Sequence, residues 1–281
     1  MKVLKLIIPV SIIVFISILA TAPLSSCKKT TTINDTVVVV KHDTTVIIDS
    51  VHDITTGLVA YYNFNNGSLK DSSGFGNHIA FNNATATADR FGNANNAYQF
   101  NGNGSYMRVA NSATLSPDNI TIHAIVKINA FYPGPCHASQ ILGKGTPDNI
   151  NGIYTVRFSD FAANCSDPID STHEYLSAGF GDGTTQTTAG AKADTMYVKK
   201  GTWYTITYTY NGLTAKMYIN GVLKASSNAT ATFTDNAHDL FIGRHEDSVF
   251  PYWFNGVIDE VRIYNRALPQ GAVKQLYSLK N

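Results

Sequence analysis

Charged residues are scarce in this chain of 281 residues, and the two signs nearly cancel. There are 21 Lys and Arg against 20 Asp and Glu, so the formal net charge is +1, and charged residues make up 15% of the chain. A protein that holds nucleic acid or an acidic lipid surface by charge needs an excess of Lys and Arg. The composition therefore predicts neither of these as a partner.

Helical periodicity is almost absent after residue 57, and turn residues and aromatics stand in its place. The chain has 15 Tyr, 14 Phe and 2 Trp, a mixture typical of strands joined by polar turns. Asn-Gly pairs accept the positive φ of tight hairpins, so their recurrence indicates antiparallel strands. They begin at Asn66, Asn101, Asn103, Asn151, Asn211, Asn220 and Asn255. The sequence predicts an all-β, antiparallel sandwich.

The N-terminus has the features of a targeting segment. Two lysines precede an apolar run from Leu6 to Leu19, and Leu24-Ser25-Ser26-Cys27 follows. This segment resembles a bacterial lipoprotein signal, which implies that Cys27 is lipidated and that the N-terminal lipid is the chain's contact with a membrane. A plain transmembrane anchor is the alternative, but the apolar run is short for a full span.

The remaining cysteines are Cys136 and Cys165. The targeting segment implies an oxidising envelope, so we expect a disulfide between these two residues. A metal or catalytic role is less favoured, because neither cysteine has a CxxC or a Cys/His ligand spacing. We expect the protein in the bacterial cell envelope, with the outer membrane favoured; the sequence does not indicate which membrane face it occupies.

The stretch Phe254–Leu268 has the pattern of a turn and one long strand. Alternate positions place Val257, Asp259, Val261 and Ile263 on one face and Ile258, Glu260, Arg262 and Tyr264 on the other. Burying a lone carboxylate is costly, so Asp259 needs a cation or a cluster of donors beside it.

Other stretches repeat this strand-and-turn pattern. They are Gly57–Phe64, Lys70–His78, Ala97–Gly102, and the hairpin of Trp203–Tyr210 with Lys216–Gly221. Together with the closing strand, they resemble the laminin G-like, concanavalin A-like jelly roll of bacterial surface proteins, from about Gly57 to the C-terminus. The resemblance implies an antiparallel two-sheet jelly roll in which the closing strand lies near the first strand.

Three parts are therefore predicted along the chain. Residues 1–27 are the signal and lipobox, residues 28–56 a Thr- and Val-rich tether, and residues 57–281 the jelly-roll domain. A short helix is expected after Pro269, with Val273, Leu276 and Tyr277 on one face.

The resemblance also implies a structural calcium ion near the closing strand. Calcium takes oxygen ligands from carboxylates, amides and carbonyls. Carried over to this chain, the metal ligands are Asp71 and Asp259, with Asn77 as a weaker candidate. The alternative is that Asp71 caps a turn and that Asp259 accepts backbone or Arg donors without a metal.

Some concanavalin A-like proteins are glycoside hydrolases, which need a pair of carboxylates a few ångström apart, with the signature Glu-x-Asp-x-Glu. The glutamates of this chain are Glu174, Glu246 and Glu260, and none lies in such a motif. A Gly-x-Ser-x-Gly elbow is also absent from the sequence. We expect no enzymatic activity.

Aromatic loops are the remaining candidates for a ligand site. The segment from Phe250 to Trp253 precedes the closing strand, and the segment from Tyr132 to His137 is a second irregular loop. Tyr132, His137, Tyr252 and Trp253 are the candidate contacts. We expect a non-catalytic, monomeric binding module for a glycan or another extracellular polymer. A structural or adhesive module for proteins is the alternative, and a divergent hydrolase is less favoured.

Overall fold

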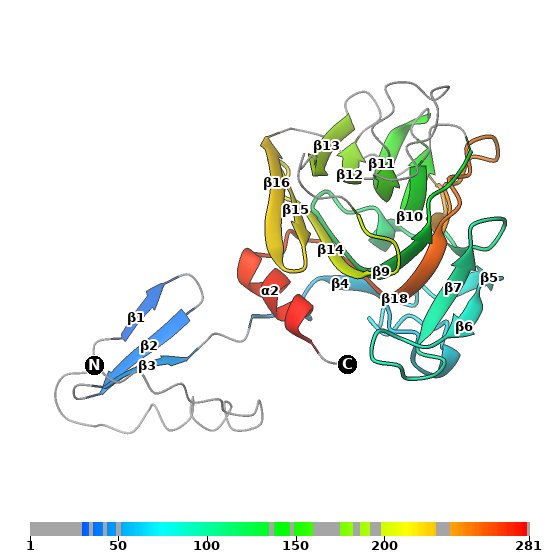
Figure 1. Ribbon diagram of the computed structural model, residues 1–281. Helices are drawn as coiled ribbons and strands as arrows, with labels where there is room; N and C mark the ends of the chain where they lie inside the picture. The colour runs from blue at the N-terminus through cyan, green and yellow to red at the C-terminus, as the bar shows by residue number, and fades with distance from the viewer. Residues whose placement is uncertain are drawn as a thin grey trace. The chain divides into compact units, whose positions relative to one another are not determined.

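The computed structural model describes residues 30–33, 36–41, 44–48, 52–134, 138–146, 149–159, 175–181, 186–191, 198–228 and 237–279 (Figure 1). The chain divides into two compact units, Met1–Asp53 and Ile54–Asn281. Among the described residues, no helix is long and apolar enough to cross a membrane.

The first unit contains a three-stranded antiparallel sheet in the order β1-β2-β3. Its strands are β1 (Thr30–Ile33), β2 (Thr36–Lys41) and β3 (Thr44–Ile48). These strands lie within residues 28–56, which the sequence predicts to be an extended tether with some tendency to form β-structure. Val37 lies opposite Ile48 in the register of β2 and β3, and β-branched residues such as these favour strands.

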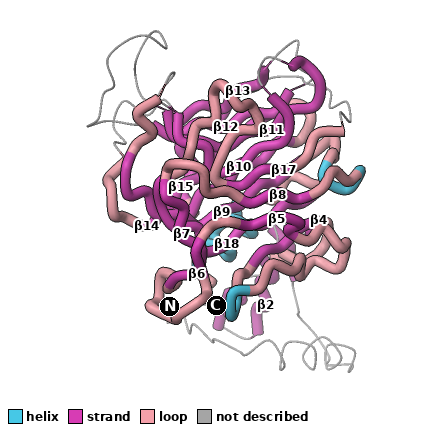
Figure 2. Tube along the Cα trace, turned by 90° about the vertical axis from the view of Figure 1, so that its right-hand side faces the viewer, coloured by secondary structure: helices cyan, strands magenta, loops and turns pink. Residues whose placement is uncertain are grey.

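The second unit is a sandwich of two antiparallel sheets, which confirms the predicted fold class. Among the described residues, one sheet has seven strands in the order β13-β12-β11-β10-β17-β8-β5, and Figure 2 shows them one after another. Its strands are β5 (Ile79–Asn82), β8 (Met107–Val109), β10 (Ala138–Thr146), β11 (Asn149–Ser159), β12 (Tyr175–Gly181), β13 (Gln186–Ala191) and β17 (Leu240–Ile242).

The other sheet has eight strands in the order β16-β15-β14-β9-β18-β7-β6, with β4 also paired to β18. Its strands are β4 (Leu58–Tyr62), β6 (Thr85–Thr87), β7 (Ala97–Asn101), β9 (Ile120–Ala130), β14 (Trp203–Tyr210), β15 (Thr214–Ile219), β16 (Val222–Asn228) and β18 (Asn255–Tyr264). The predicted hairpin of β14 and β15 is present, with Tyr208 opposite Met217.

The core lies between the two sheets and is rich in aromatic rings. The largest fully buried side chains include Phe100, Phe158, Phe180, Tyr208 and Phe254. On β14, every second residue enters this core, as the sequence predicts from its alternation. Burial of these aromatic side chains, together with the aliphatic residues of the core, is the main favourable term for folding of the sandwich.

Strand β18 occupies the middle of the eight-stranded sheet. It pairs with β9 along its length, and its other edge pairs first with β7 and then with β4. Arg262 lies opposite Tyr61, so the last strand does lie beside the first strand of the domain. The domain begins at Ile54, slightly before the predicted Gly57, because the Ile54 carbonyl accepts a hydrogen bond from the Tyr264 hydroxyl at 3.0 Å.

One detail of β18 differs from the prediction. A register shift around Asp259 sets two residues of β18 against one of β9, so the alternation of faces changes there. Ile258, Val261 and Ile263 all belong to the core, whereas Val257 does not. The predicted faces of Val257 and Ile258 are therefore exchanged, because a bulge cannot be seen in a simple alternation.

The chain ends in the helix α2 (Gln270–Ser278), which follows Pro269 as predicted. Val273 and Leu276 are buried, while Tyr277 is 50% exposed and does not share their burial. The helix packs on a second small cluster of buried residues that includes Tyr218 and Tyr264, on the outer face of the eight-stranded sheet.

Candidate functional site

The Asp71 carboxylate is buried, and it accepts hydrogen bonds from donors in its own loop and in β4. Oδ1 accepts the backbone N–H groups of Tyr61 and Ser73, each at 2.8 Å. Oδ2 accepts the Ser73 hydroxyl at 2.8 Å and the N–H of Asn77 at 3.0 Å. A carboxylate has about four lone-pair sites, so these four donors satisfy it. Asp71 therefore holds the loop of residues 71–78 against β4.

Asp259 has an arginine as its partner. Nη1 of Arg90 lies 3.0 Å from Oδ2 of Asp259, and the backbone N–H of Arg90 donates to the same oxygen at 3.3 Å. Arg90 Nη2 also donates to the carbonyl of Leu279 at 3.0 Å, so the guanidinium joins β18 to the end of α2. Burial raises the pKa of Asp259 to about 6, because it outweighs the attraction of Arg90.

These contacts do not fit a calcium centre made by Asp71, Asn77 and Asp259. The donors described above occupy the Asp71 oxygens, and the Asn77 amide donates to the Val59 carbonyl and the Thr114 hydroxyl. The charge of the Arg90 guanidinium beside Asp259 opposes a second cation there. In the described part of the chain, no three His, Cys, Asp or Glu residues come together as metal ligands.

A line of polar side chains crosses the outer face of the eight-stranded sheet; we call it the polar row. Its members lie opposite one another on β4, β18, β9, β14 and β15, and they are Tyr61, Arg262, His123, Thr207 and Tyr218. Nε of Arg262 donates to Glu260 at 2.6 Å, and Nη2 donates to the Tyr61 hydroxyl at 3.0 Å. His123 Nδ1 lies 2.8 Å from the Thr207 hydroxyl.

The polar row is a structural hydrogen-bond network, and burial decides the ionisation states of His123 and Tyr61 within it. Burial lowers the pKa of His123 to about 4, so its ring is neutral at pH 7 and its 3.8 Å contact with Glu260 is not an ion pair there. Burial and the Glu260 charge raise the pKa of Tyr61 to about 12. Glu260 and Arg262 remain as a charged pair, each less than 10% exposed.

Three of the described carboxylates, including the two described glutamates, each have a basic partner. Glu260 is bonded to Arg262 and Asp259 to Arg90, and Glu246 lies 2.8 Å from the His238 ring. Each of these groups therefore has a partner of its own. Glu174 lies outside the described residues.

A group of aromatic side chains gathers on the outer face of the seven-stranded sheet; we call it the aromatic face. Its members are Phe81, Tyr106, Phe241 and Trp253. The Tyr106 ring is central, with its centroid 4.7 Å from that of Phe81, 6.0 Å from Phe241 and 6.1 Å from Trp253. Phe81 is 38% exposed, and the other three are partly exposed. The strands β5 and β17, the loop before β8 and the loop before β18 thus supply one continuous set of rings.

Arg244 binds this set of rings to the loop that carries Trp253. Its guanidinium carbon lies 4.7 Å from the Trp253 ring centroid, 5.2 Å from Tyr106 and 5.6 Å from Phe241. Nη2 donates to the carbonyls of Glu246 and Asp247, each at 2.9 Å. Burial lowers the pKa of Arg244. Because its Nε and Nη2 donors are used by loop carbonyls, Arg244 holds the loop against the aromatic face.

Next to the aromatic face, the same sheet surface becomes polar. Gln140 on β10 lies opposite Arg157 on β11, which lies opposite Ser177 on β12. The Gln140 amide donates to the Thr155 hydroxyl at 2.6 Å, and the Gln140 Oε1 atom is buried without a partner in the described structure. Aromatic and amide groups therefore share one face of the sandwich.

The predicted contact residues Trp253, Tyr252 and Tyr132 have different surroundings in the structure. Trp253 belongs to the aromatic face, whereas Tyr252 is 7% exposed and packs against Tyr132 with ring centroids 6.3 Å apart. The Tyr252 carbonyl accepts the N–H of Gln140 at 2.8 Å, which fixes the loop on β10. Tyr252 thus serves as an anchor inside the loop. The side chain of Tyr132 is partly exposed at the loop's edge.

Several predicted residues lie outside the described residues. They are Cys27, Cys136, His137 and Cys165. The lipidation and the disulfide therefore stay predictions.

The sequence analysis missed Phe81, Tyr106, Phe241 and Arg244. A signal exists for Tyr106, because Met107 and Val109 enter the core and leave Tyr106 and Arg108 outside. Phe241 stands between Leu240 and Ile242, so the run of three apolar residues hides its outward position.

Comparisons with known proteins agree with this architecture. A family model described as the concanavalin A-like lectin/glucanases superfamily matches residues 100–274. A comparison with curated proteins finds no match. Among solved structures, domain 4 of AbnA, a GH43 extracellular arabinanase from Geobacillus stearothermophilus, in complex with arabinotriose, is similar. Its TM-score is 0.55 at 21% identity, and the match covers 79% of this chain and 98% of that one.

Two toxin domains are similar as well. The binding domain of Paraclostridial Mosquitocidal Protein 1 has a TM-score of 0.60 at 16% identity, and the match covers 80% of this chain and 52% of that one. The binding domain of botulinum neurotoxin DC in complex with SialylT has a TM-score of 0.57 at 12% identity, with 80% and 52% covered. This chain thus spans about half the length of these domains. Such low identities show a shared fold, and with the family match they establish that the chain belongs to the concanavalin A-like lectin/glucanase superfamily.

Proposed function

We propose that this protein is a non-catalytic module that binds a glycan through its aromatic face. The observation that carries the proposal is the set of four rings around Tyr106. Aromatic rings bury the apolar CH surface of a sugar, and nearby amides bond its hydroxyl groups. Arg157 on β11, which is partly exposed, supplies a polar group on the same sheet surface.

The two cations nearest the four rings do not require an acidic saccharide. The Arg244 guanidinium is occupied by loop carbonyls, and Arg108 forms an ion pair with Asp239 at 2.7 Å. These two cations therefore have partners within the protein. A domain of the same fold in an arabinanase is in complex with arabinotriose, so the fold is able to hold a saccharide.

The test is binding of the full chain, in detergent, to an array of neutral and acidic glycans, followed by titration of the best ligand. Trp253→Ala and Tyr106→Ala should each weaken binding at least about tenfold, which corresponds to about 1.4 kcal/mol. Phe91→Ala is the matched control, because Phe91 is 49% exposed and is not one of the four rings of the aromatic face. Its affinity should equal that of the unsubstituted protein.

Two results would contradict the proposal. One is that no glycan on the array binds saturably. The other is that Trp253→Ala and Tyr106→Ala fold normally and bind as tightly as Phe91→Ala, which would place the ligand on another surface.

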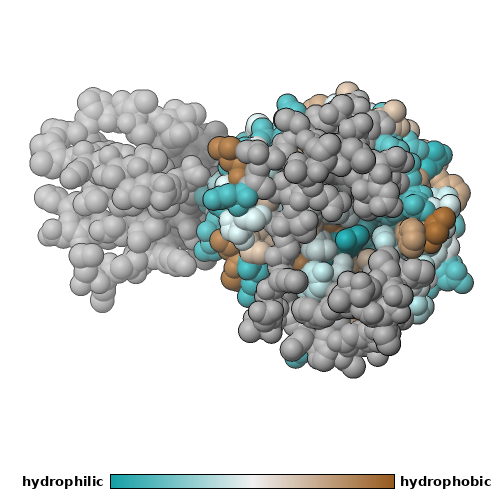
Figure 3. Space-filling model, turned by 90° about the horizontal axis from the view of Figure 1, so that it is seen from above, coloured by the Kyte–Doolittle hydropathy of each residue, from teal (hydrophilic) through white to brown (hydrophobic). Residues whose placement is uncertain are grey.

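A structural or adhesive module that holds another protein is the second candidate. Such a module needs a broad exposed apolar patch. On the surface seen in Figure 3, the described apolar residues stand in small separate groups among hydrophilic ones. The described residues of that face therefore do not form the broad apolar patch that such a module would need.

We also propose that Cys27 carries the lipid and holds a monomer at the outer membrane of the cell envelope. The signal-like sequence before Cys27 supports this. Cys27→Ser should move the protein from the membrane fraction to the soluble fraction. Membrane retention of that variant with its signal removed would contradict the anchor.

A further inference from the structure

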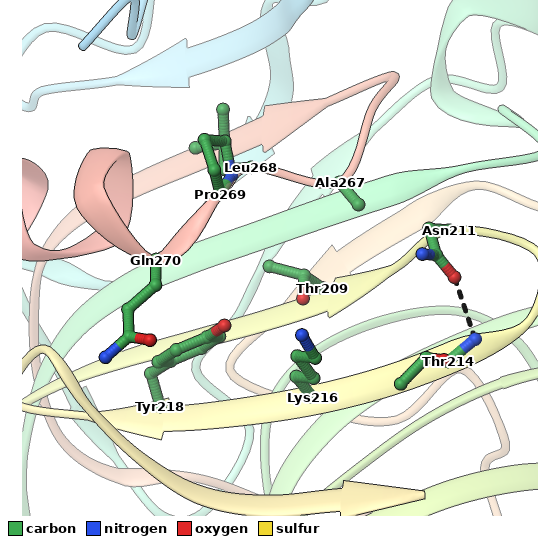
Figure 4. A pocket seen from close by; sticks show the side chains of 9 residues that line it. All are labelled: Thr209, Asn211, Thr214, Lys216, Tyr218, Ala267, Leu268, Pro269 and Gln270. Carbon is green, nitrogen blue, oxygen red and sulfur yellow. Dashed lines mark hydrogen bonds between the residues drawn. The ribbon is translucent and has the colours of Figure 1, made fainter. Parts of the chain in front are cut away.

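A pocket of about 210 Å³ opens on the outer face of the eight-stranded sheet, where α2 begins. We call it the helix-entry pocket. Its floor is formed by β14 and β15, and its roof by the segment of residues 267–270 (Figure 4). The aromatic face lies on the other sheet of the sandwich, so the two sites use different surfaces.

Polar groups converge in the helix-entry pocket. Figure 4 shows the amine of Lys216 and the hydroxyl groups of Thr209 and Tyr218 pointing toward the same space, with the amide of Gln270 beside the Tyr218 ring. Thr209 is 3% exposed and Tyr218 is 2% exposed. Among the described residues, neither hydroxyl has a hydrogen-bond partner, so a ligand in the pocket would supply one.

The charge of the helix-entry pocket is positive. Lys216 is the one charged residue that lines it, and no ion pair between described residues includes Lys216. The start of α2 adds to this charge, because no side chain caps the helix and its first turn contains no acidic residue. Free N–H groups at a helix N-terminus favour an anion.

We propose that the helix-entry pocket binds the carboxylate of a small sugar acid, with Lys216 as its counter-ion. A single lysine matches the single negative charge of a carboxylate, whereas a phosphate monoester carries about −1.5 to −2 at pH 7. The pocket is smaller than the roughly 300 Å³ at which drug-sized sites begin, which suits a single hexuronate. Thr209, Tyr218 and Gln270 provide groups for its hydroxyls.

The experiment is titration calorimetry of the full chain in detergent with glucuronate, inorganic phosphate and glucose. Glucuronate should bind, and glucose, which lacks the carboxylate, should not. Lys216→Met should weaken glucuronate binding at least about tenfold. Lys224→Met is the matched control, since Lys224 is exposed on β16 and does not line the pocket.

A second variant distinguishes loss of glucuronate binding from loss of the fold. Gln270→Glu places a negative charge at the first turn of α2, where the helix dipole favours it, so the fold should keep its stability. The same charge repels a carboxylate, so glucuronate binding should be lost. Trp253→Ala should leave glucuronate binding unchanged, which separates this pocket from the aromatic face.

Three outcomes would overturn the proposal. They are the absence of glucuronate binding, binding of glucose as tight as that of glucuronate, and unchanged glucuronate affinity in both Lys216→Met and Gln270→Glu. Tighter binding of phosphate than of glucuronate would also overturn it, because the pocket would then prefer a more highly charged oxyanion.

Discussion

Arg262 and Glu260 form a charged pair on β18 that is almost completely buried. Nε of Arg262 lies 2.6 Å from Oε1 of Glu260. The Tyr61 hydroxyl donates a hydrogen bond to Glu260 and accepts one from Nη2 of Arg262. The Arg262 guanidinium also lies over the Tyr61 ring, at 4.1 Å. Such a pair adds little net stability over an apolar one, but removing one member leaves the other charge buried and unmatched.

Glu260→Gln should therefore destabilise the protein by about 3–5 kcal/mol. The measurement is the free energy of unfolding in urea at pH 7. Asp239→Asn is the control, because the Arg108–Asp239 pair is 43% and 24% exposed and should contribute less than about 1 kcal/mol. Equal effects of the two substitutions would contradict this account of the buried pair.

His123 should make stability depend on pH. Its pKa is lowered from 6.5 to about 4 in the folded state, so its contribution is complete above pH 6.5 and is lost as the pH falls toward 4. Asp259 acts in the opposite direction, because its raised pKa lowers stability as the pH rises from about 4 to about 6.

The His123→Gln variant separates the two effects. The difference in unfolding free energy between the unsubstituted protein and this variant should grow by about 3 kcal/mol from pH 4 to pH 6.5. A difference that stays constant over this range would show that His123 titrates normally in the folded protein.

At the residue scale, the sequence predicts that Asp259 needs a donor or a cation, because a buried carboxylate needs one. It does not predict which residue supplies it. The donor is Arg90, which is 169 residues away along the chain, and no local pattern connects the two. In the same way, nothing local indicates that the donors of residues 61–77 fill the Asp71 carboxylate.

At the scale of single elements, α2 is held to the sheet by a few apolar side chains. Leu276 is 1% exposed in the cluster under the helix. Leu276→Ala should lower stability by about 2–5 kcal/mol, since it leaves a cavity there. Lys274→Ala, on the exposed side of the same helix, is the control and should change the unfolding free energy by less than about 0.5 kcal/mol. Similar losses from both would mean that α2 is not docked as described.

Strands and helices could be predicted from the sequence where a single residue periodicity runs through the whole element. The alternation of β14 and the Pro269 start of α2 are both found in the structure. The bulge at Asp259 was not predictable, because one extra residue interrupts the period without a sequence marker. The aromatic face was missed for a related reason. It is assembled from β5, β17 and two loops that only the sheet order brings together.

At the scale of the whole molecule, the calcium hypothesis has a direct test. Because Asp71 and Asp259 already have donors, adding calcium or a chelator should leave the thermal midpoint of the full chain unchanged. A rise of several degrees with calcium that Asp259→Ala abolishes would instead establish the metal site. Asp118→Ala, which changes a carboxylate outside these contacts, serves as the control substitution.

The position of β18 has a consequence for how the chain folds. β18 is the last strand in the chain, yet it lies between β9 on one side and β7 and β4 on the other. Until β18 is in place, the eight-stranded sheet has a gap at its centre, and two strand edges are without partners. The chain therefore cannot complete its sandwich from its earlier strands alone, and those open edges must be kept from pairing with other chains until the final strand is added.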